Sequence, residues 1–139
     1  MNNNLIKAKN SLQKGNYTCV LCSCDQLYFS TERGIKPLVN WLNSGIDFSG
    51  FSGADKVVGK GAAFLYALMK VKNLYASVIS KPALLVLNDY GIEVEFDTLV
   101  DYIVNRKGDG VCPFEEAVKD VSDAQKAYDI ICNKLQSFK

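Results

Sequence analysis

The residues that could carry chemistry in this chain are its five cysteines, because the 139-residue sequence contains no histidine. Without histidine, neither a Ser-His nor a Cys-His nucleophilic pair can form, and no histidine can ligate a metal. Cys19 and Cys22 have the CxxC spacing of metal and redox sites. They lie in a run of strand-forming residues, 17–24, in which alternate side chains point to opposite faces. We therefore interpret them as small core residues of a strand.

Cys112 has the sequence neighbourhood that most favours reactivity. It stands at the expected start of a helix, and Arg106 and Lys107 precede it by a few residues. A helix start and nearby cations both favour the thiolate form. One hypothesis is therefore an enzyme that uses Cys112 as its nucleophile and Asp55 or Asp109 as its proton carrier. The competing interpretation is a buried or capping cysteine.

The composition is that of an ordinary globular protein. Apolar types make up 48% of the residues and charged types 22%, which argues against disorder and against a disulfide mini-scaffold. Sixteen basic and fifteen acidic residues leave a net charge of +1, so we expect neither nucleic acid nor a membrane as a partner. The odd cysteine count, the absence of a signal-like N-terminus and the lack of a bilayer-spanning apolar run indicate a cytoplasmic protein with free thiols.

An α/β fold is expected to position these residues. Helices are predicted where apolar residues recur at helical spacing or where proline or serine opens an element, and strands where strand formers cluster. The predicted helices cover residues 4–14, 36–43, 54–70, 80–90 and 98–104, and two more begin at Pro113 and Ser122. The predicted strands cover residues 17–24, 27–31, 74–79 and 92–96, of which the first two form a hairpin.

The order of these elements predicts how they pack. Strands that alternate with helices after an opening hairpin favour a mixed sheet with helices on both faces and right-handed crossovers. Gly59 and Gly61 inside the longest apolar segment predict that a sheet or another backbone packs close against them. No linker divides the sequence, so we expect one domain over residues 1–139, with an N-terminal helix in residues 1–15 and a core in residues 16–139.

Two runs of residues resemble the signatures of a known family. The runs are Gly53-Ala54-Asp55-Lys56-Val57-Val58-Gly59-Lys60 and Asn105-Arg106-Lys107-Gly108-Asp109-Gly110-Val111-Cys112-Pro113. They are similar to two motifs of a small bacterial and archaeal domain family of unknown function that has a cytidine-deaminase-like fold. The resemblance covers residues 17–135. It implies a three-layer α/β/α architecture around a mixed five-stranded sheet, which agrees with the predicted order of elements.

The same resemblance implies that zinc chemistry has been lost. A zinc deaminase carries a His or Cys ligand and a catalytic Glu at one helix start, and two Cys ligands in Pro-Cys-x-x-Cys at the next. Here the first motif would fall on Gly53-Ala54-Asp55 and the second on residues 82–86, where Ala83 and Val86 replace the cysteines. We therefore expect no metal, no cofactor and no zinc-dependent deamination, with Asp55 left as a candidate catalytic acid.

A deaminase-like arrangement would bring the starts of helices 54–70 and 80–90 to one pocket. Unpaired backbone N–H groups at helix N-termini favour an anion, so the first hypothesis is a small anionic or phosphorylated ligand. The predicted ligand-binding residues come from two helix starts and one loop: Ser52, Gly53, Ala54, Lys56, Ser80, Lys81, Asn105, Arg106, Lys107 and Asp109. The competing interpretation is that the serines and Asp55 are ordinary helix caps and that the pocket is filled.

A third hypothesis is an interaction module. Five aromatic residues gather before the long apolar segment: Tyr28, Phe29, Trp41, Phe48 and Phe51. Exposed together, they would form a surface for a partner protein or for a homo-oligomer. Packed inside, they would belong to the core.

Overall fold

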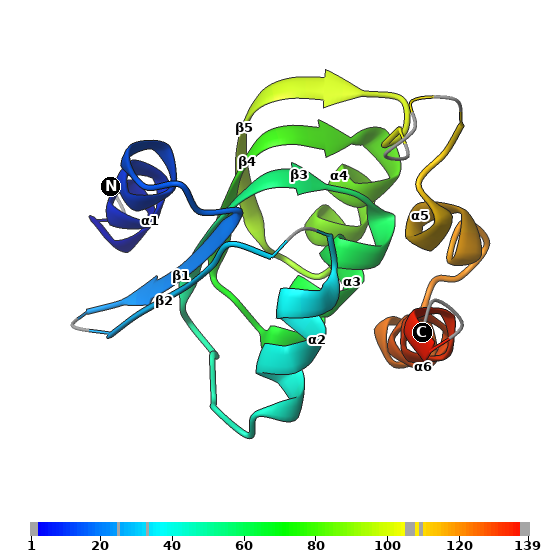
Figure 1. Ribbon diagram of the computed structural model, residues 1–139, viewed down its shortest axis with the longest axis horizontal. Coiled ribbons are helices and arrows are strands. Elements are labelled where there is room, and N and C mark those ends of the chain that lie inside the picture. The colour runs from blue at the N-terminus through cyan, green and yellow to red at the C-terminus, as the bar shows by residue number, and fades with distance from the viewer. Residues whose placement is uncertain (1–2, 25, 33, 105–107, 109, 137–139) are drawn as a thin grey trace.

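The fold is built around a mixed five-stranded sheet in the order β2-β1-β3-β4-β5 (Figure 1). The structure is a computed structural model that describes residues 3–24, 26–32, 34–104, 108 and 110–136. The strands are β1 (Cys19–Ser23), β2 (Gln26–Ser30), β3 (Ser52–Val58), β4 (Asn73–Ser80) and β5 (Glu93–Val100). β1 is antiparallel to both β2 and β3, whereas β3, β4 and β5 are parallel. The expected α/β class, the mixed sheet and the opening hairpin are confirmed.

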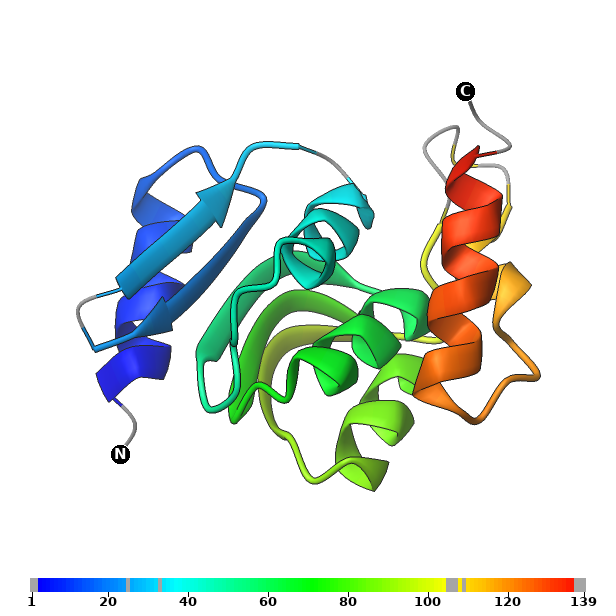
Figure 2. The ribbon, with the colours of Figure 1, turned by 90° about the horizontal axis from the view of Figure 1, so that it is seen from below.

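Helices cover both faces of this sheet. They are α1 (Asn3–Lys14), α2 (Lys36–Asn43), α3 (Lys60–Met69), α4 (Lys81–Asp89), α5 (Pro113–Ala117) and α6 (Ala124–Gln136). On one face, Ala8 and Leu12 of α1 pack against Val20, Ala54 and Tyr75 of the sheet. The larger core lies on the other face, under α2, α3, α4 and α6. Figure 2 shows these four helices together and α1 apart from them, beside the hairpin.

The predicted helix over residues 54–70 is wrong in its first third. Ser52–Val58 is a strand, Gly59 is the N-cap residue, and α3 begins at Lys60. Periodicity could not separate the two elements, because a buried parallel strand and a buried helix are both apolar nearly all round. The β-branched pair Val57 and Val58, followed by Gly59, was the local signal for a strand that ends before a helix.

The predicted helix over residues 98–104 is also wrong. β5 continues to Val100, and Val104 forms an isolated antiparallel bridge with Val111. The last helix begins two residues after the predicted Ser122, because Asp123 acts as its cap: the Lys126 N–H donates to Asp123 Oδ2 at 2.9 Å.

The prediction that a sheet or another backbone packs against Gly59 and Gly61 is wrong: the nearest atoms around both glycines belong to side chains, and Gly59 lies before α3. A Cβ on Gly61 would lie 3.1 Å from Ile35 Cδ1 and 3.4 Å from Ile131 Cδ1. This fully packed position explains why α3 tolerates a residue that weakens helices by about 1 kcal/mol. None of the helices in the described part of the chain combines the length and hydrophobicity that crossing a membrane requires.

Candidate functional site

The candidate site lies where two neighbouring parallel strands end and two helices begin. Val58 at the end of β3 pairs with Ile79 near the end of β4. Gly59 then caps α3, and Ser80 caps α4 by accepting a hydrogen bond from the Ala83 N–H at 3.2 Å. Because the strands are adjacent and parallel, both helices begin at the same edge of the sheet. The resemblance implied two neighbouring helix starts, although it placed the first at residue 54 and not at Lys60. Helix starts of this kind carry unpaired N–H groups and partial positive charge.

A carboxylate from the chain itself occupies the space between these helix starts. Glu115 of α5 is 5% exposed. Its Oε2 accepts hydrogen bonds from the Lys60 N–H at 2.7 Å and from Ser80 Oγ at 2.5 Å, while its Oε1 accepts from the Ile103 N–H at 2.6 Å. The acceptors therefore meet donors from α3, from the cap of α4 and from the segment after β5. Glu115 satisfies the helix start in the way that a bound anion would.

Sequence reasoning missed Glu115, and the local pattern offered no signal for it. Glu115 and Glu116 both lie in the first turn of α5, where acidic residues are common because of the helix dipole. Glu116 is exposed and pairs with Lys119 at 2.9 Å, three residues along the helix. Only the packing of α5 against the two helix starts distinguishes the two residues.

Four of the predicted ligand-binding residues lie on β3 and not at a helix start. Ser52, Gly53 and Ala54 are buried in the first half of this strand, far along it from the start of α3. Lys56 is exposed, and its N–H donates to the Thr18 carbonyl at 3.1 Å. The expectation that these residues wall the pocket depended on the wrong helix boundary, and it is corrected here.

Ser80 and Lys81 do lie at the start of α4, as predicted. Ser80 is fully buried and points to Glu115, whereas Lys81 is exposed and forms an ion pair with Asp101 at 2.9 Å. Lys60 takes the place expected for Lys56, with its Nζ donating to the Lys119 carbonyl at 2.6 Å.

The remaining predicted ligand-binding residues, Asn105, Arg106, Lys107 and Asp109, lie outside the described residues. They belong to the segment between β5 and α5.

The two helix starts do not fit the zinc site of a deaminase. The start of α3 falls on residues 59–61, six residues later than the motif alignment placed it, and this Gly-Lys-Gly sequence offers no metal-ligating side chain. Ala83 and Val86 at the start of α4 offer none either. In the described part of the chain, no three or more acidic, cysteine or histidine side chains are grouped so that they could hold a metal ion. We derive no step through zinc.

A second group of titratable side chains, Asp55, Tyr66 and Cys19, lies between the sheet and α3. Asp55 Oδ2 accepts a hydrogen bond from the hydroxyl of the fully buried Tyr66 at 2.6 Å, and Asp55 Oδ1 accepts from the Val57 N–H at 3.3 Å. Burial raises the pKa of Asp55 to about 7, although these hydrogen bonds act in the opposite direction. Cys19 on β1 is paired with Asp55 on β3. Burial is the main cause that raises the pKa of the Cys19 thiol, and the negative charge of Asp55 raises it further.

Cys112 and Asp55 occupy different places. Cys112 is the partly buried N-cap residue of α5, and its N–H donates to the Ile103 carbonyl at 2.8 Å. No contact between described residues joins it to Asp55. The hypothesis of a Cys112 nucleophile served by Asp55 or Asp109 stays a prediction, and Asp109 lies outside the described residues.

The aromatic cluster is core and not a surface. Phe48 and Phe51 are buried with their ring centroids 5.2 Å apart, and Tyr28 and Trp41 pack on them. Phe29 does not belong to this cluster: it is 50% exposed, and its ring lies 4.3 Å from that of Tyr17.

A substitution at Gly59 can test how closely the Glu115 side chain packs against the start of α3. A Cβ on Gly59 would lie 3.2 Å from Glu115 Oε2 and 3.1 Å from Ile103 Cγ1. We expect Gly59→Ala to lower the free energy of unfolding by about 1–2 kcal/mol, because the added methyl displaces both neighbours. Urea denaturation of the single variant and of the same change in a Glu115→Ala background measures this. An equal cost in both backgrounds would contradict the contact with Glu115.

Comparison with known proteins identifies relatives of this chain. Residues 7–135 match the model of a protein family described as a domain of unknown function, DUF1893. Among solved structures, the 2.70 Å crystal structure of a DUF1893 family protein from Thermotoga maritima is similar, with a TM-score of 0.88. The two sequences are 30% identical, and the match covers 96% of this chain and 92% of that chain. No curated protein matches the sequence.

Proposed function

The chain belongs to the DUF1893 family, a domain of unknown function, and we propose that it binds a small anionic or phosphorylated ligand in exchange for the Glu115 carboxylate. The observation that carries the proposal is that Glu115 itself is held between the starts of α3 and α4. Three donors, the Lys60 N–H, Ser80 Oγ and the Ile103 N–H, are already arranged around a carboxylate. A phosphate offers more charge and more acceptor oxygens to the same donors.

Two lysines support the preference for a phosphate. Lys60 is the first residue of α3 and Lys81 the first residue of α4. The Lys60 ammonium group donates to the Lys119 carbonyl, and the Lys81 ammonium group pairs with the Asp101 carboxylate. The Lys81–Asp101 ion pair is exposed and therefore holds Lys81 only weakly. Both side chains are long enough to turn toward an anion at the helix starts. The displaced Glu115 would move with α5, so ligand binding and the position of α5 are coupled in this proposal.

A cytidine-deaminase-like fold without zinc chemistry is part of the same proposal, with residues 1–139 as one domain. A mixed five-stranded sheet, helices on both faces and two helices that begin side by side support it. All five cysteines are free thiols, which supports a reducing cytoplasmic location.

The test is a thermal-shift measurement with inorganic phosphate and a set of sugar phosphates and nucleotides. A ligand at a hundred times its Kd stabilises the folded protein by about 2.7 kcal/mol, which raises the midpoint of a chain of this size by roughly 10 °C. We expect Ser80→Ala to abolish the shift, because it removes one donor. The matched control is Ser77→Ala, since Ser77 is also on β4 but contacts the Tyr75 hydroxyl.

Formate added to the Glu115→Ala variant separates two possible failures. If formate stabilises this variant but no anion shifts the natural protein, the donors bind anions and Glu115 closes the site permanently. If neither protein responds, the helix starts bind no anion at all. Each result would overturn the proposed ligand exchange.

Asp55 supports a second candidate, a metal-independent enzyme that uses this carboxyl as its acid or base. A pKa of about 7 is the range in which a general acid or base works at neutral pH, and Asp55 is partly exposed. The Tyr66 hydroxyl fixes its orientation.

A further inference from the structure

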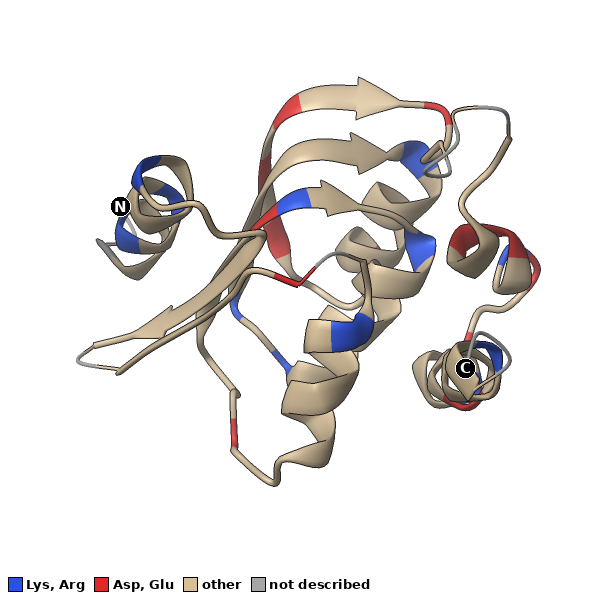
Figure 3. Ribbon diagram, in the orientation of Figure 1, with Lys and Arg blue, Asp and Glu red and all other residues tan. Residues whose placement is uncertain are grey.

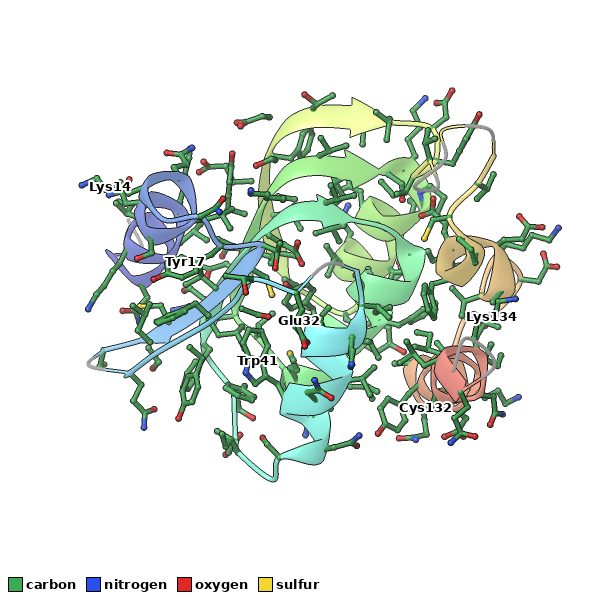
Figure 4. The ribbon with its side chains drawn as sticks, in the orientation of Figure 1. Lys14, Tyr17, Glu32, Trp41, Cys132 and Lys134 are labelled. Carbon is green, nitrogen blue, oxygen red and sulfur yellow. The ribbon has the colours of Figure 1, made fainter. Side chains whose placement is uncertain are left out.

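An open groove with a volume of about 550 Å³ runs between α1 and β2, away from the Glu115 site. Ile6 and Lys7 of α1 form part of one wall, Leu27 of β2 forms part of the other, and Tyr17 lies between them. Figure 4 shows Lys14 on the outer side of α1, with Tyr17 between this helix and the hairpin. Ile6 is 41% exposed and Leu27 is 37% exposed, so each wall of the groove presents an apolar side chain to solvent.

β2 is an edge strand without the usual protection of an edge. No strand of the described structure pairs with its outer side, and residues 26–30 include neither a charged residue nor a proline. Leu27 and Phe29 are exposed on it. Charged residues and prolines normally prevent edge strands from pairing with other chains. The opposite edge strand, β5, carries Glu93, Glu95 and Asp97 and has this protection.

The charges beside the groove indicate what kind of chain would pair there. Lys7 and Lys14 lie along it, and none of the described residues that line it is acidic. Figure 3 shows the basic residues on α1 and the acidic ones on β5. Lys7 Nζ donates to the Cys24 carbonyl at 3.3 Å, and no acidic side chain among the described residues forms an ion pair with it. An acidic partner segment would be attracted to this groove.

A second copy of the chain fits the groove poorly. Two β2 strands that pair antiparallel in one continuous sheet are related by a two-fold axis perpendicular to the sheet, so both α1 helices would lie on the same face. Lys7 and Lys14 of the two copies would then approach one another. Like charges placed together across an interface are unfavourable.

We propose that β2 and the α1 groove bind an extended segment of another protein that presents apolar and acidic side chains on the same face of the strand it forms. The segment adds a sixth strand at the β2 edge through main-chain hydrogen bonds. Every second side chain of the segment points toward α1. Among these, the apolar side chains pack on Leu27 and Tyr17, and the acidic side chains reach Lys7 and Lys14. The Glu115 site plays no part in this binding.

The probe is a fluorescein-labelled peptide, Val-Thr-Glu-Thr-Val-Thr-Glu, in which the valines and glutamates share one face of a strand. Its binding is followed by fluorescence polarisation. We expect at least tenfold weaker binding when lysine replaces glutamate in the peptide, and again when proline replaces its central threonine, because proline removes a main-chain donor. In the protein, Phe29→Lys and Lys14→Glu should each weaken binding at least tenfold. Phe96→Lys is the matched control, because Phe96 is an exposed aromatic residue on the opposite edge strand.

Three results would overturn the proposal. One is failure of the peptide to bind the natural protein at millimolar concentration. Another is equal weakening by Phe29→Lys and Phe96→Lys when circular dichroism shows both variants folded. The third is a natural protein that is dimeric by light scattering and becomes monomeric in Phe29→Lys, since a second copy would then cover the edge. Lys14→Glu changes no buried residue and keeps the test valid if Phe29→Lys fails to fold.

Discussion

Replacing Glu115 with alanine is expected to lower the free energy of unfolding by about 3–5 kcal/mol. The change removes three hydrogen bonds at once and leaves the Lys60 N–H, Ser80 Oγ and the Ile103 N–H without their acceptor. Buried donors without partners are costly, and they stay buried because α3 and α4 are fixed by the core. For 139 residues this corresponds to a fall of roughly 10–15 °C in Tm.

Glu116→Ala provides the matched control for this measurement. Glu116 is the next residue of α5, is exposed, and forms only a surface ion pair with Lys119. Its removal should change the free energy of unfolding by less than about 0.5 kcal/mol. Glu115→Gln should fall between the two, because an amide keeps one acceptor oxygen but places an NH₂ group against donors. Similar Tm values for Glu115→Ala and Glu116→Ala would show that the Glu115 network does not hold the helix starts.

The second large effect is a dependence of stability on pH that Asp55→Asn removes. Burial raises the pKa of Asp55 to about 7 in the folded protein, against 3.8 for an ordinary aspartate. The folded state therefore binds the proton more tightly than the unfolded state, and the stabilisation from this site is complete below pH 3.8 and lost as pH rises to about 7. An asparagine at position 55 cannot ionise, so the variant does not lose this stability as the pH rises.

The measurement compares the free energies of unfolding of the two proteins in urea between pH 4 and pH 8. The stability of Asp55→Asn relative to the natural protein should increase by about 2–4 kcal/mol across this range and then become constant above pH 7. Tyr66→Phe should move the plateau to higher pH, because the Tyr66 hydroxyl is a hydrogen bond that lowers the pKa of Asp55. Parallel pH curves for the natural protein and Asp55→Asn would refute a raised pKa. They would also remove the support for acid or base catalysis at this residue.

Most of the secondary structure could be predicted from the sequence, and the errors have a common cause. The hairpin, α1, α2, α4 and the helix start at Pro113 follow local rules of turns, caps and periodicity. Residues 54–58 and 98–100 were predicted as helix but form parts of β3 and β5. Strand pairing over long sequence separations decided these segments, and hydrophobic periodicity does not report it.

Of the residues predicted for the candidate site, Ser80 and Lys81 lie at a helix start, whereas Ser52, Gly53, Ala54 and Lys56 lie on β3. The deaminase-like resemblance implied that two helix starts converge, and the serine before Pro82 predicted that Ser80 caps the second of them. The acceptor that fills the position, Glu115, lies 55 residues after Lys60 in the sequence. The raised pKa of Asp55 likewise depends on burial under α3, which no local pattern contains.

The sequence by itself determined the absence of histidine chemistry, the missing zinc-ligand pattern, the α/β class and most element starts, because these depend on residue types and on neighbours within a few positions. The tertiary structure alone decided that Glu115 and not Glu116 closes the helix starts, that Asp55 is held by Tyr66, and that β2 is an unprotected edge. Desolvation, hydrogen-bond partners and strand neighbours are set by residues far apart in the chain. These properties therefore take definite values only when the chain folds and excludes water.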